Sequence, residues 1–310
     1  MSPVRCALRP KSCQALADEA LRCGAQLERG IDSVRAQTGR RPTIAYRNGT
    51  EKELRPRLTT GADGRTSLVR KQAGIQMKIL AATHVIAGLL VDGGSRWLSD
   101  HYTIGVEGDV QFYVFPQGCG HLRLYTCLAN EQATRWAGPG GPKRMVNAFA
   151  RLRAIPEEMG LADITPAGPC ATFGGEQSWC DEPYAEGVVL IGDAGGYDDP
   201  VDGQGLSLAM SDVRHLSELL LSSNDWTQSA LRPYAERRTE RLRRMRRVSR
   251  TFAALMTTFT AAGRARRARF YQASQQGRED LKAALGAISL GPDRLPPAAF
   301  SDKLHETLLA

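Results

Sequence analysis

The 310 residues are enough for one large or two modest domains with a sizeable core, and the longest apolar tract, residues 79–91, is too short to span a bilayer. The formal net charge of +8 lies mostly in residues 232–250, where nine arginines stand against two glutamates; this pattern favours a solvated helix face over a nucleic-acid-binding surface. Seven cysteines, an odd number without a C-x-x-C pair, argue against a disulfide framework or a metal site such as zinc, and with no apolar leader at the N-terminus they indicate a cytoplasmic protein.

The N-terminal region is predicted to combine short strands with one helix. Apolar residues alternate over residues 1–8, which predicts a strand, and a helix follows over residues 12–23 with Ser12 as a candidate cap. Residues 30–45 are polar and predict a strand pair or a meander. The sequence Arg-Asn-Gly-Thr at residues 47–50 has the composition of a hairpin turn, so an antiparallel pairing is expected there.

A Gly/Asp turn follows and leads into a short helix. Its centre is the sequence Gly-Ala-Asp-Gly at residues 61–64, which puts the carboxylate of Asp63 and the flexible backbone of Gly64 in one loop. Such a loop can present an acid and backbone N–H groups to a ligand. The alternative is an ordinary turn in which both residues have a structural role.

The middle of the chain changes to long alternating segments, which predict an antiparallel sheet. Strands are expected at residues 79–91, 111–115 and 121–128, the last two joined through residues 116–120. Residues 138–142, rich in Gly and Pro, read as a linker, and residues 145–159 are predicted to be helical. Residues 163–185 then connect this region to the segment that begins at residue 187.

Residues 187–221 carry the most chemical information. An apolar run from Val188 to Ile191 suits a strand buried on both faces of a parallel sheet, and it stops at Gly192-Asp193. From Gly192 to Gly205 the chain holds five glycines and a proline, and an amphipathic helix begins near Gly205. A carboxylate at a strand end can accept hydrogen bonds from hydroxyl groups, and a helix N-terminus attracts negative charge. The segment therefore predicts a cofactor cradle, or else an ordinary strand-to-helix loop with glycine caps. After residue 225 the chain is expected to be helical and basic, apart from a break at residues 291–297.

These two turns together resemble the FAD-dependent aromatic-hydroxylase type of monooxygenase, the family of p-hydroxybenzoate hydroxylase. The resemblance rests on Gly-Ala-Asp-Gly at residues 61–64 with Ser67 and Arg70 downstream, and on Leu-Ile-Gly-Asp-Ala at residues 190–194 followed by Asp-Pro and Gly-Gln-Gly at residues 199–205. It covers most of residues 1–222. Two motifs in the right order are more specific than either alone.

The resemblance implies a role for each motif residue. Asp193 would hold the ribityl and diphosphate region of FAD, and Asp63 and Gly64 would lie near the cofactor arm. Arg9 would make a basic contact to FAD. The flavin ring would lie against the side chain or backbone of five residues: Pro200, Gly203, Gln204, Gly205 and Leu206. No residue is predicted to be catalytic.

One part of the family pattern is missing from the sequence. Such enzymes begin with a strand, a G-x-G-x-x-G turn and a helix, and no G-x-G-x-x-G occurs in these 310 residues. The expected fold class is therefore α/β, mixed with α+β: an N-terminally incomplete, Rossmann-like FAD-binding domain with an inserted antiparallel-sheet substrate domain and C-terminal helices. The expected domains are residues 1–75 (FAD-binding, partial), 76–178 (substrate), 179–222 (FAD-binding, flavin side) and 223–310 (helical).

The implied activity is that of an FAD-dependent monooxygenase, or a fragment of one. It would use NADH or NADPH and molecular oxygen to oxygenate a small organic substrate, aromatic or polyketide-like, through a flavin 4a-hydroperoxide. A homo-oligomer is compatible with the sequence. Two alternatives stay open: a related flavin oxidoreductase such as a reductase or halogenase-like enzyme, and a non-catalytic remnant that binds a partner through its Arg-rich helix.

Overall fold

A computed structural model of the protein describes residues 9–310, apart from the side chains of residues 9–11 and 280. The strand predicted over residues 1–8 lies outside the described residues. The rest divides into two units. Unit 1 contains the described residues up to Leu27 together with Ala82–Gly175 and Ala253–Arg267, and unit 2 contains Glu28–Ala81, Glu176–Phe252 and Ala268–Ala310.

Unit 1 is built on an antiparallel sheet, as the alternating segments predict. Its strand order is β10-β6-β9-β8-β7, and β11 also pairs with β6. The register of β8 and β9 pairs Gly118 with His121 and so confirms the turn predicted at residues 116–120. The strands are β6 (His84–Asp92), β7 (Thr103–Glu107), β8 (Val110–Gly118), β9 (His121–Ala129), β10 (Thr165–Pro166) and β11 (Ala171–Gly174).

One predicted strand is in fact two. Residues 79–91 contain the end of β5 (Lys78–Leu80), which pairs with β12 (Gln177–Trp179) in unit 2, and most of β6, which lies in unit 1. The exposed side chains of β5 have the same apolar character as the buried ones of β6, because apolar composition alone does not mark where a strand changes partner.

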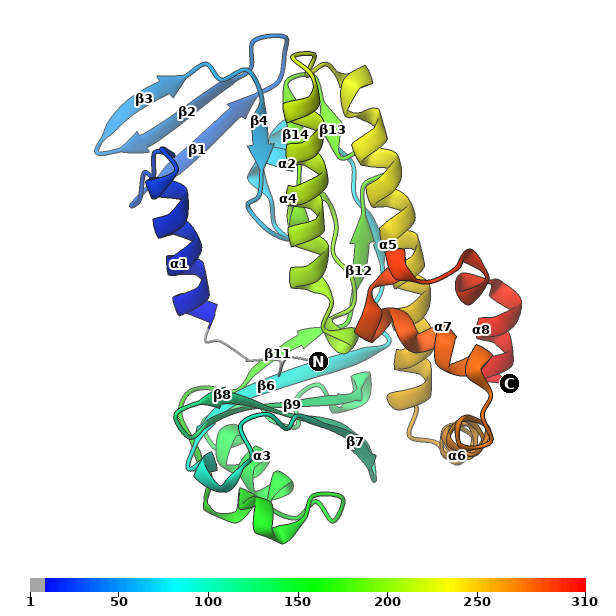
Figure 1. Ribbon diagram of the computed structural model, residues 1–310. Helices are drawn as coiled ribbons and strands as arrows, with labels where there is room; N and C mark the ends of the chain where they lie inside the picture. Colours follow the sequence, from blue (N-terminus) through cyan, green and yellow to red (C-terminus); the bar gives the residue numbers. More distant parts are fainter. Residues whose placement is uncertain (1–8) are drawn as a thin grey trace. The chain divides into compact units, whose positions relative to one another are not determined.

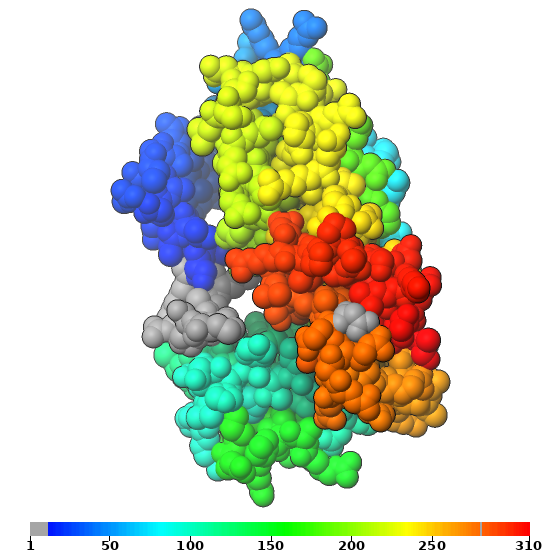
Figure 2. Space-filling view, turned by 45° about the vertical axis from the view of Figure 1, so that its right-hand side comes forward, coloured from blue at the N-terminus to red at the C-terminus, as the bar shows by residue number. Residues whose placement is uncertain are grey.

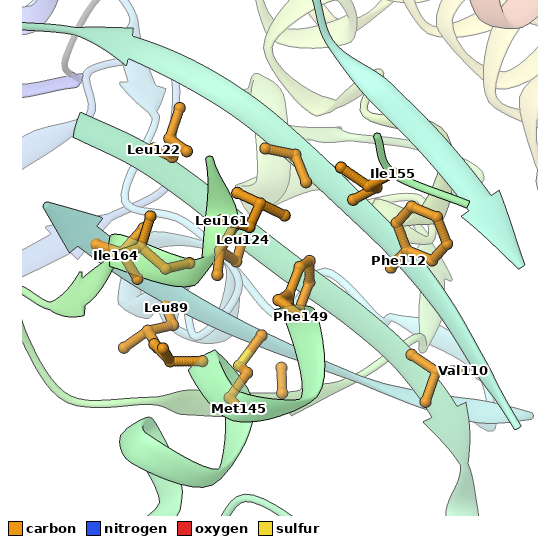
Figure 3. Packing of buried hydrophobic residues seen from close by; sticks show 14 of the residues in the cluster. Leu89, Val110, Phe112, Leu122, Leu124, Met145, Phe149, Ile155, Leu161 and Ile164 are labelled. Carbon is orange, nitrogen blue, oxygen red and sulfur yellow. The ribbon is translucent and has the colours of Figure 1, made fainter. Parts of the chain in front are cut away.

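Helix α3 (Gly141–Phe149) covers one face of the unit 1 sheet. Met145 and Phe149 on α3 point toward Leu89, Phe112 and Leu124 on the strands, and all five are buried (Figure 3). The predicted helix over residues 145–159 overlaps α3 only at residues 145–149, so its predicted bounds are wrong.

The helix starts with Pro142 in its first turn, which suits the fixed φ of proline, and it ends at Phe149. Pro156 cannot continue a helix and disfavours the helical conformation of Ile155, which instead packs into the same core. Helix α1 (Arg9–Arg22), also in unit 1, begins before Ser12, so Ser12 lies inside the helix and does not cap it.

Unit 2 contains the predicted meander and the predicted buried strand, which has a parallel partner (Figure 1). Strands β1 (Ser33–Gln37), β2 (Thr43–Asn48) and β3 (Thr50–Leu54) are antiparallel, and Asn48 pairs with Thr50 across Gly49. Strand β4 (Thr59–Gly61) runs parallel to β14 (Val188–Leu190), whose other edge pairs with β13 (Tyr184–Ala185). The three residues of β14 have no exposed surface, which confirms a strand buried on both faces.

Helices complete unit 2. α2 (Leu68–Gln72) follows β4, and α4 (Gly205–Ser222) follows β14; α4 and α5 (Gln228–Met256) lie side by side, coloured yellow-green and yellow in Figure 2. The helical character predicted after residue 225 is confirmed by α5, α6 (Ala261–Gln275), α7 (Glu279–Leu290) and α8 (Asp302–Leu309). The predicted class, mixed α/β with an antiparallel sheet and C-terminal helices, is thus confirmed. Among the described helices, none has both the length and the apolarity needed to cross a bilayer.

Candidate functional site

The two turns identified in the sequence meet at one edge of the parallel pair. Gly61 pairs with Leu190 at the ends of β4 and β14, and the carboxyl ends of parallel strands share an edge. Residues 63 and 193, which are 130 positions apart in the chain, therefore follow neighbouring strand ends. Arg70 on α2 donates a hydrogen bond to the carbonyl oxygen of Ala194 at 3.2 Å, so the second turn is tied directly to the first helix.

The carboxylate of Asp63 is committed to the start of α2. It accepts hydrogen bonds from the hydroxyl of Ser67 at 2.5 Å and from the backbone N–H groups of Leu68 and Val69 at 2.7 and 3.1 Å. Burial opposes the ionisation of Asp63, but these hydrogen bonds outweigh burial and hold the pKa of the carboxyl below its usual range. Asp63 therefore shapes the turn, and Gly64 allows it by taking a φ of 79°.

Ser67 caps α2 and completes this network, which gives a first testable expectation. Its hydroxyl oxygen accepts from the N–H of Arg70 at 2.9 Å. We expect Ser67→Ala to lower the free energy of unfolding by about 1 kcal/mol, the usual value of an N-cap, measured by chemical denaturation. Thr66→Ala, at the exposed neighbouring position, is the matched control. Equal effects of the two substitutions would contradict the capping role.

Asp193 differs from Asp63 in its partners: a cation approaches its carboxylate, whereas the carboxylate of Asp63 is bound to the start of α2. It lies in the 3₁₀ turn Gly192–Gly195 with its side chain 43 % exposed, and Arg65 approaches it to 3.7 Å. The guanidinium of Arg65 also lies over the ring of Tyr197, 4.3 Å from its centroid. The oxygens of Asp193 can accept hydrogen bonds from hydroxyl groups of a bound molecule, with a positive charge beside them.

The glycine turn after β14 is held from behind by a buried arginine. Arg238 on α5 donates to Asp212 of α4 at 2.8 Å, and the two side chains are only 3 % and 6 % exposed. The same guanidinium donates to the carbonyl oxygens of Gly192, Gly195 and Gly196 at 2.8–3.1 Å. The carboxylate of Asp212 also accepts a hydrogen bond from the backbone N–H of Gly192 at 2.9 Å. One ion pair thus fixes the turn that presents Asp193.

The Arg-rich stretch, residues 232–250, is therefore not simply the solvated helix face that its composition predicts. Arg238 and Arg241 are buried, whereas Arg232 and Arg243 are exposed. The exposed arginines pair with glutamates on their own helix, which is what the composition indicated for the whole stretch.

The first turn of α4 offers unsatisfied donors. The side chain of Gln204, at the N-cap position, donates to the carbonyl oxygen of Ile288 and makes no cap hydrogen bond. The backbone N–H groups of Gly205, Leu206 and Ser207 thus have no acceptor within the helix, and the side chain of Gln204 does not accept from them. Gly203 and Gly205 are exposed, and a Cβ atom added at either would meet no atom within 4 Å. An 18-residue helix directs its positive end at this open space, which suits a negatively charged group.

Most, but not all, of the predicted site residues lie in one unit. Asp63, Gly64, Asp193, Pro200 and the start of α4 belong to unit 2. Arg9 begins α1 in unit 1, and its side chain lies outside the described residues, so its predicted contact stays a prediction.

Sequence reasoning missed three residues that shape the site: Arg65, Asp212 and Arg238. A signal existed for Arg238, since it shares the spacing of three and four with the buried Tyr234, Leu242 and Met245 on α5. Arg65 directly follows Gly64, but nothing in its neighbourhood shows that it meets Asp193.

The chain is similar to known proteins in sequence and in fold. A family model described as an FAD binding domain matches residues 7–249. Digeranylgeranylglycerophospholipid reductase from Methanothrix thermoacetophila is 28 % identical over 241 residues, which are 72 % of this chain and 57 % of that protein. A second reductase of the same name, from Methanopyrus kandleri, is 22 % identical over 205 residues, 60 % of this chain and 47 % of that protein. The chain thus spans about half the length of the curated relatives it matches.

Solved structures with the same fold include two flavin-dependent or hydroxylating enzymes. A flavin-dependent brominase superposes with a TM-score of 0.75 at 16 % identity, over 97 % of this chain and 75 % of that one. The anhydrotetracycline hydroxylase OxyS from Streptomyces rimosus superposes with a TM-score of 0.66 at 18 % identity, over 91 % of this chain and 56 % of that one. At these identities the likeness establishes the fold.

Proposed function

This chain belongs to the FAD binding domain family, and on that premise we propose that it holds FAD at the edge of the β4–β14 pair and serves an FAD-dependent monooxygenase. The observation that carries the proposal is that one strand–turn–helix segment presents both the partly exposed carboxylate of Asp193 and, at the start of α4, an uncapped and exposed helix N-terminus. A hydroxyl-rich ligand with a group that becomes anionic needs both. The expected FAD-binding segments, residues 1–75 and 179–222, contain these features, with residues 76–178 as the substrate domain and 223–310 as a helical region.

Each predicted residue has a proposed task. The carboxylate of Asp193 accepts hydrogen bonds from the hydroxyl groups of the cofactor arm, while Asp63 and Gly64 hold the neighbouring turn in shape. The backbone of Gly203–Leu206 donates to the flavin ring, and Pro200 packs beside it. Arg9 supplies a basic contact. FAD, when bound, accepts hydride from NADH or NADPH and activates molecular oxygen.

The proposed substrate is a small organic molecule, aromatic or polyketide-like. OxyS supports this choice, since it shares the fold and its substrate is an anhydrotetracycline. The second candidate is a related flavin oxidoreductase, favoured by the 28 % identity to digeranylgeranylglycerophospholipid reductase and by the fold shared with a brominase. Product analysis with isotope-labelled oxygen separates them, because only a monooxygenase places one labelled atom in the organic product.

FAD titration of Asp193→Ala tests the cofactor site. We expect the dissociation constant to rise about 10- to 100-fold, or about 1.4 to 2.8 kcal/mol, because the carboxylate hydrogen bonds to ligand hydroxyls are lost. The free energy of unfolding should stay within about 0.5 kcal/mol of the unaltered protein, since Asp193 is partly exposed. Flavin fluorescence measures the first quantity and chemical denaturation the second.

Glu218→Gln is the matched control, because Glu218 is exposed on the same unit and lies on α4 beyond its first turns. It should leave FAD affinity unchanged. A chain that takes up no FAD, or an Asp193→Ala variant that binds FAD as tightly as the Glu218→Gln control, would count against the proposed site.

A further inference from the structure

Two buried carboxyl groups lie at the ends of the short turn that leads into α4. Asp198 precedes the 3₁₀ turn Pro200–Asp202, and Asp202 ends it; they are 6 % and 8 % exposed. Ser249 of α5 lies between them, with its Oγ 2.7 Å from Asp198 Oδ2 and 2.8 Å from Asp202 Oδ2. Both carboxyl groups therefore converge on one hydroxyl.

The hydrogen-bond count around Ser249 favours an additional proton. The hydroxyl has a single proton to donate and two lone pairs. Its oxygen also lies 2.7 Å from the carbonyl oxygen of Met245, so three acceptor oxygens surround one donor if both carboxyls are ionised. If one carboxyl is protonated, it donates to Ser249, and Ser249 donates to the other carboxylate.

The remaining oxygens of the pair are already occupied. Asp198 Oδ1 accepts from the side-chain amide of Gln177 on β12 and from the N–H of Asp199. Asp202 Oδ1 accepts from the N–H of Gln204 at 3.1 Å. The extra proton therefore belongs on the Oδ2 atoms that face Ser249.

We propose that Asp198 and Asp202 share one proton through Ser249, and that this proton holds the Pro200–Asp202 turn against α5 and so positions the N-terminus of α4. Loss of the proton leaves two buried negative charges that face the same oxygen. Their repulsion drives the turn away from α5, toward water. Both carboxyl groups are buried and act through the position of the backbone, so these are positioning residues.

Burial and the neighbouring carboxylates favour a retained proton on the pair, whereas the positive charge of Arg246 opposes it. Burial raises the pKa of Asp198 to about 6, and burial together with the charge of Asp198 raises the pKa of Asp202 well above its usual range. Asp199, on the same turn, adds a further negative charge. From α5, Arg246 is the positive group whose charge interacts with Asp198; its guanidinium stacks over Trp179 of β12 at 4.0 Å.

The effect of pH on stability follows from these directions. An unfolded aspartate titrates near pH ~4, whereas the folded pair keeps its proton to higher pH. Between these values the folded chain binds more protons than the unfolded chain, so stability falls as pH rises from about 4 through 6 and beyond. In Asp202→Asn the amide is neutral at every pH and can donate to Ser249, so this fall should be largely removed.

The first test uses the protein without added FAD. Thermal unfolding is measured from pH 5 to pH 8.5 for the unaltered chain, Asp202→Asn, Asp198→Asn and the exposed control Glu218→Gln. We expect the midpoint of the unaltered chain and of the control to fall across this range, and those of the two asparagine variants to fall less. Identical profiles for all four would overturn the proposal. Infrared spectroscopy of the unaltered chain keeps the test valid if a variant does not fold, because a protonated carboxyl band must be present at pH 6 and lost at alkaline pH.

The second test rests on the proposed function and measures FAD affinity. If the protonated pair positions α4, the dissociation constant of the unaltered chain should rise about tenfold for each pH unit above the titration of the pair, and that of Asp202→Asn should rise less. An affinity with the same pH dependence in both overturns the link to α4. A chain that shows the infrared band and the stability profile but binds no FAD keeps the shared proton and overturns the proposed function instead.

Discussion

Replacing Arg238 by alanine is expected to lower the free energy of unfolding by about 3–5 kcal/mol. The substitution leaves Asp212 as a buried charge without its cation, and removing one partner of a buried ion pair has a cost of this size. It also removes the donors to the carbonyl oxygens of Gly192, Gly195 and Gly196. Chemical denaturation of the protein without added FAD measures the loss.

Two further variants make this expectation specific. Arg243→Ala removes an arginine of the same helix that is 50 % exposed and paired with Glu240, so it should change stability by no more than about 1 kcal/mol. Arg238→Lys keeps the charge but not the planar fork of donors, and should recover only part of the loss. If Arg238→Ala were as mild as Arg243→Ala, the buried ion pair would not be what fixes the glycine turn.

The sequence predicts those parts of the fold that depend on local patterns. The unbroken apolar run at residues 188–191 predicts a strand buried on both faces, and alternation predicts the antiparallel sheet. These features are local, so neighbouring residues determine them.

The parts that the sequence could not predict depend on partners far along the chain. Asp63 and Asp193 look alike in sequence, yet one carboxylate caps a helix and the other pairs with Arg65. The spacing of Arg238 indicates that it faces the buried side of α5, but not that it meets Asp212 of α4. Asp198 and Asp202 look like turn residues, and only Ser249, about 50 positions away, shows that they share an environment.

Gly196→Ala is expected to be the second most damaging change, with a loss of at least about 2 kcal/mol in the free energy of unfolding. Gly196 has a φ of 130°, which is strained for any residue with a Cβ atom. A Cβ atom there would lie 2.6 Å from the carbonyl oxygen of Ser178 and 2.7 Å from the Cα atom of Trp179. Both neighbours are backbone atoms of β12, so the clash cannot be relieved by a change of rotamer.

Gly203→Ala is the matched comparison, because it separates the architecture of the turn from the proposed cofactor surface. Gly203 also has a positive φ, 71°, but a Cβ atom there meets nothing within 4 Å, so we expect a loss of only about 1 kcal/mol. The added methyl group would, however, project into the open space at the start of α4 where FAD is proposed to bind. Gly203→Ala should therefore weaken FAD binding while the protein stays folded, whereas Gly196→Ala should lower stability whether or not FAD is present. The reverse pattern would mean that the open space before α4 is not the flavin site.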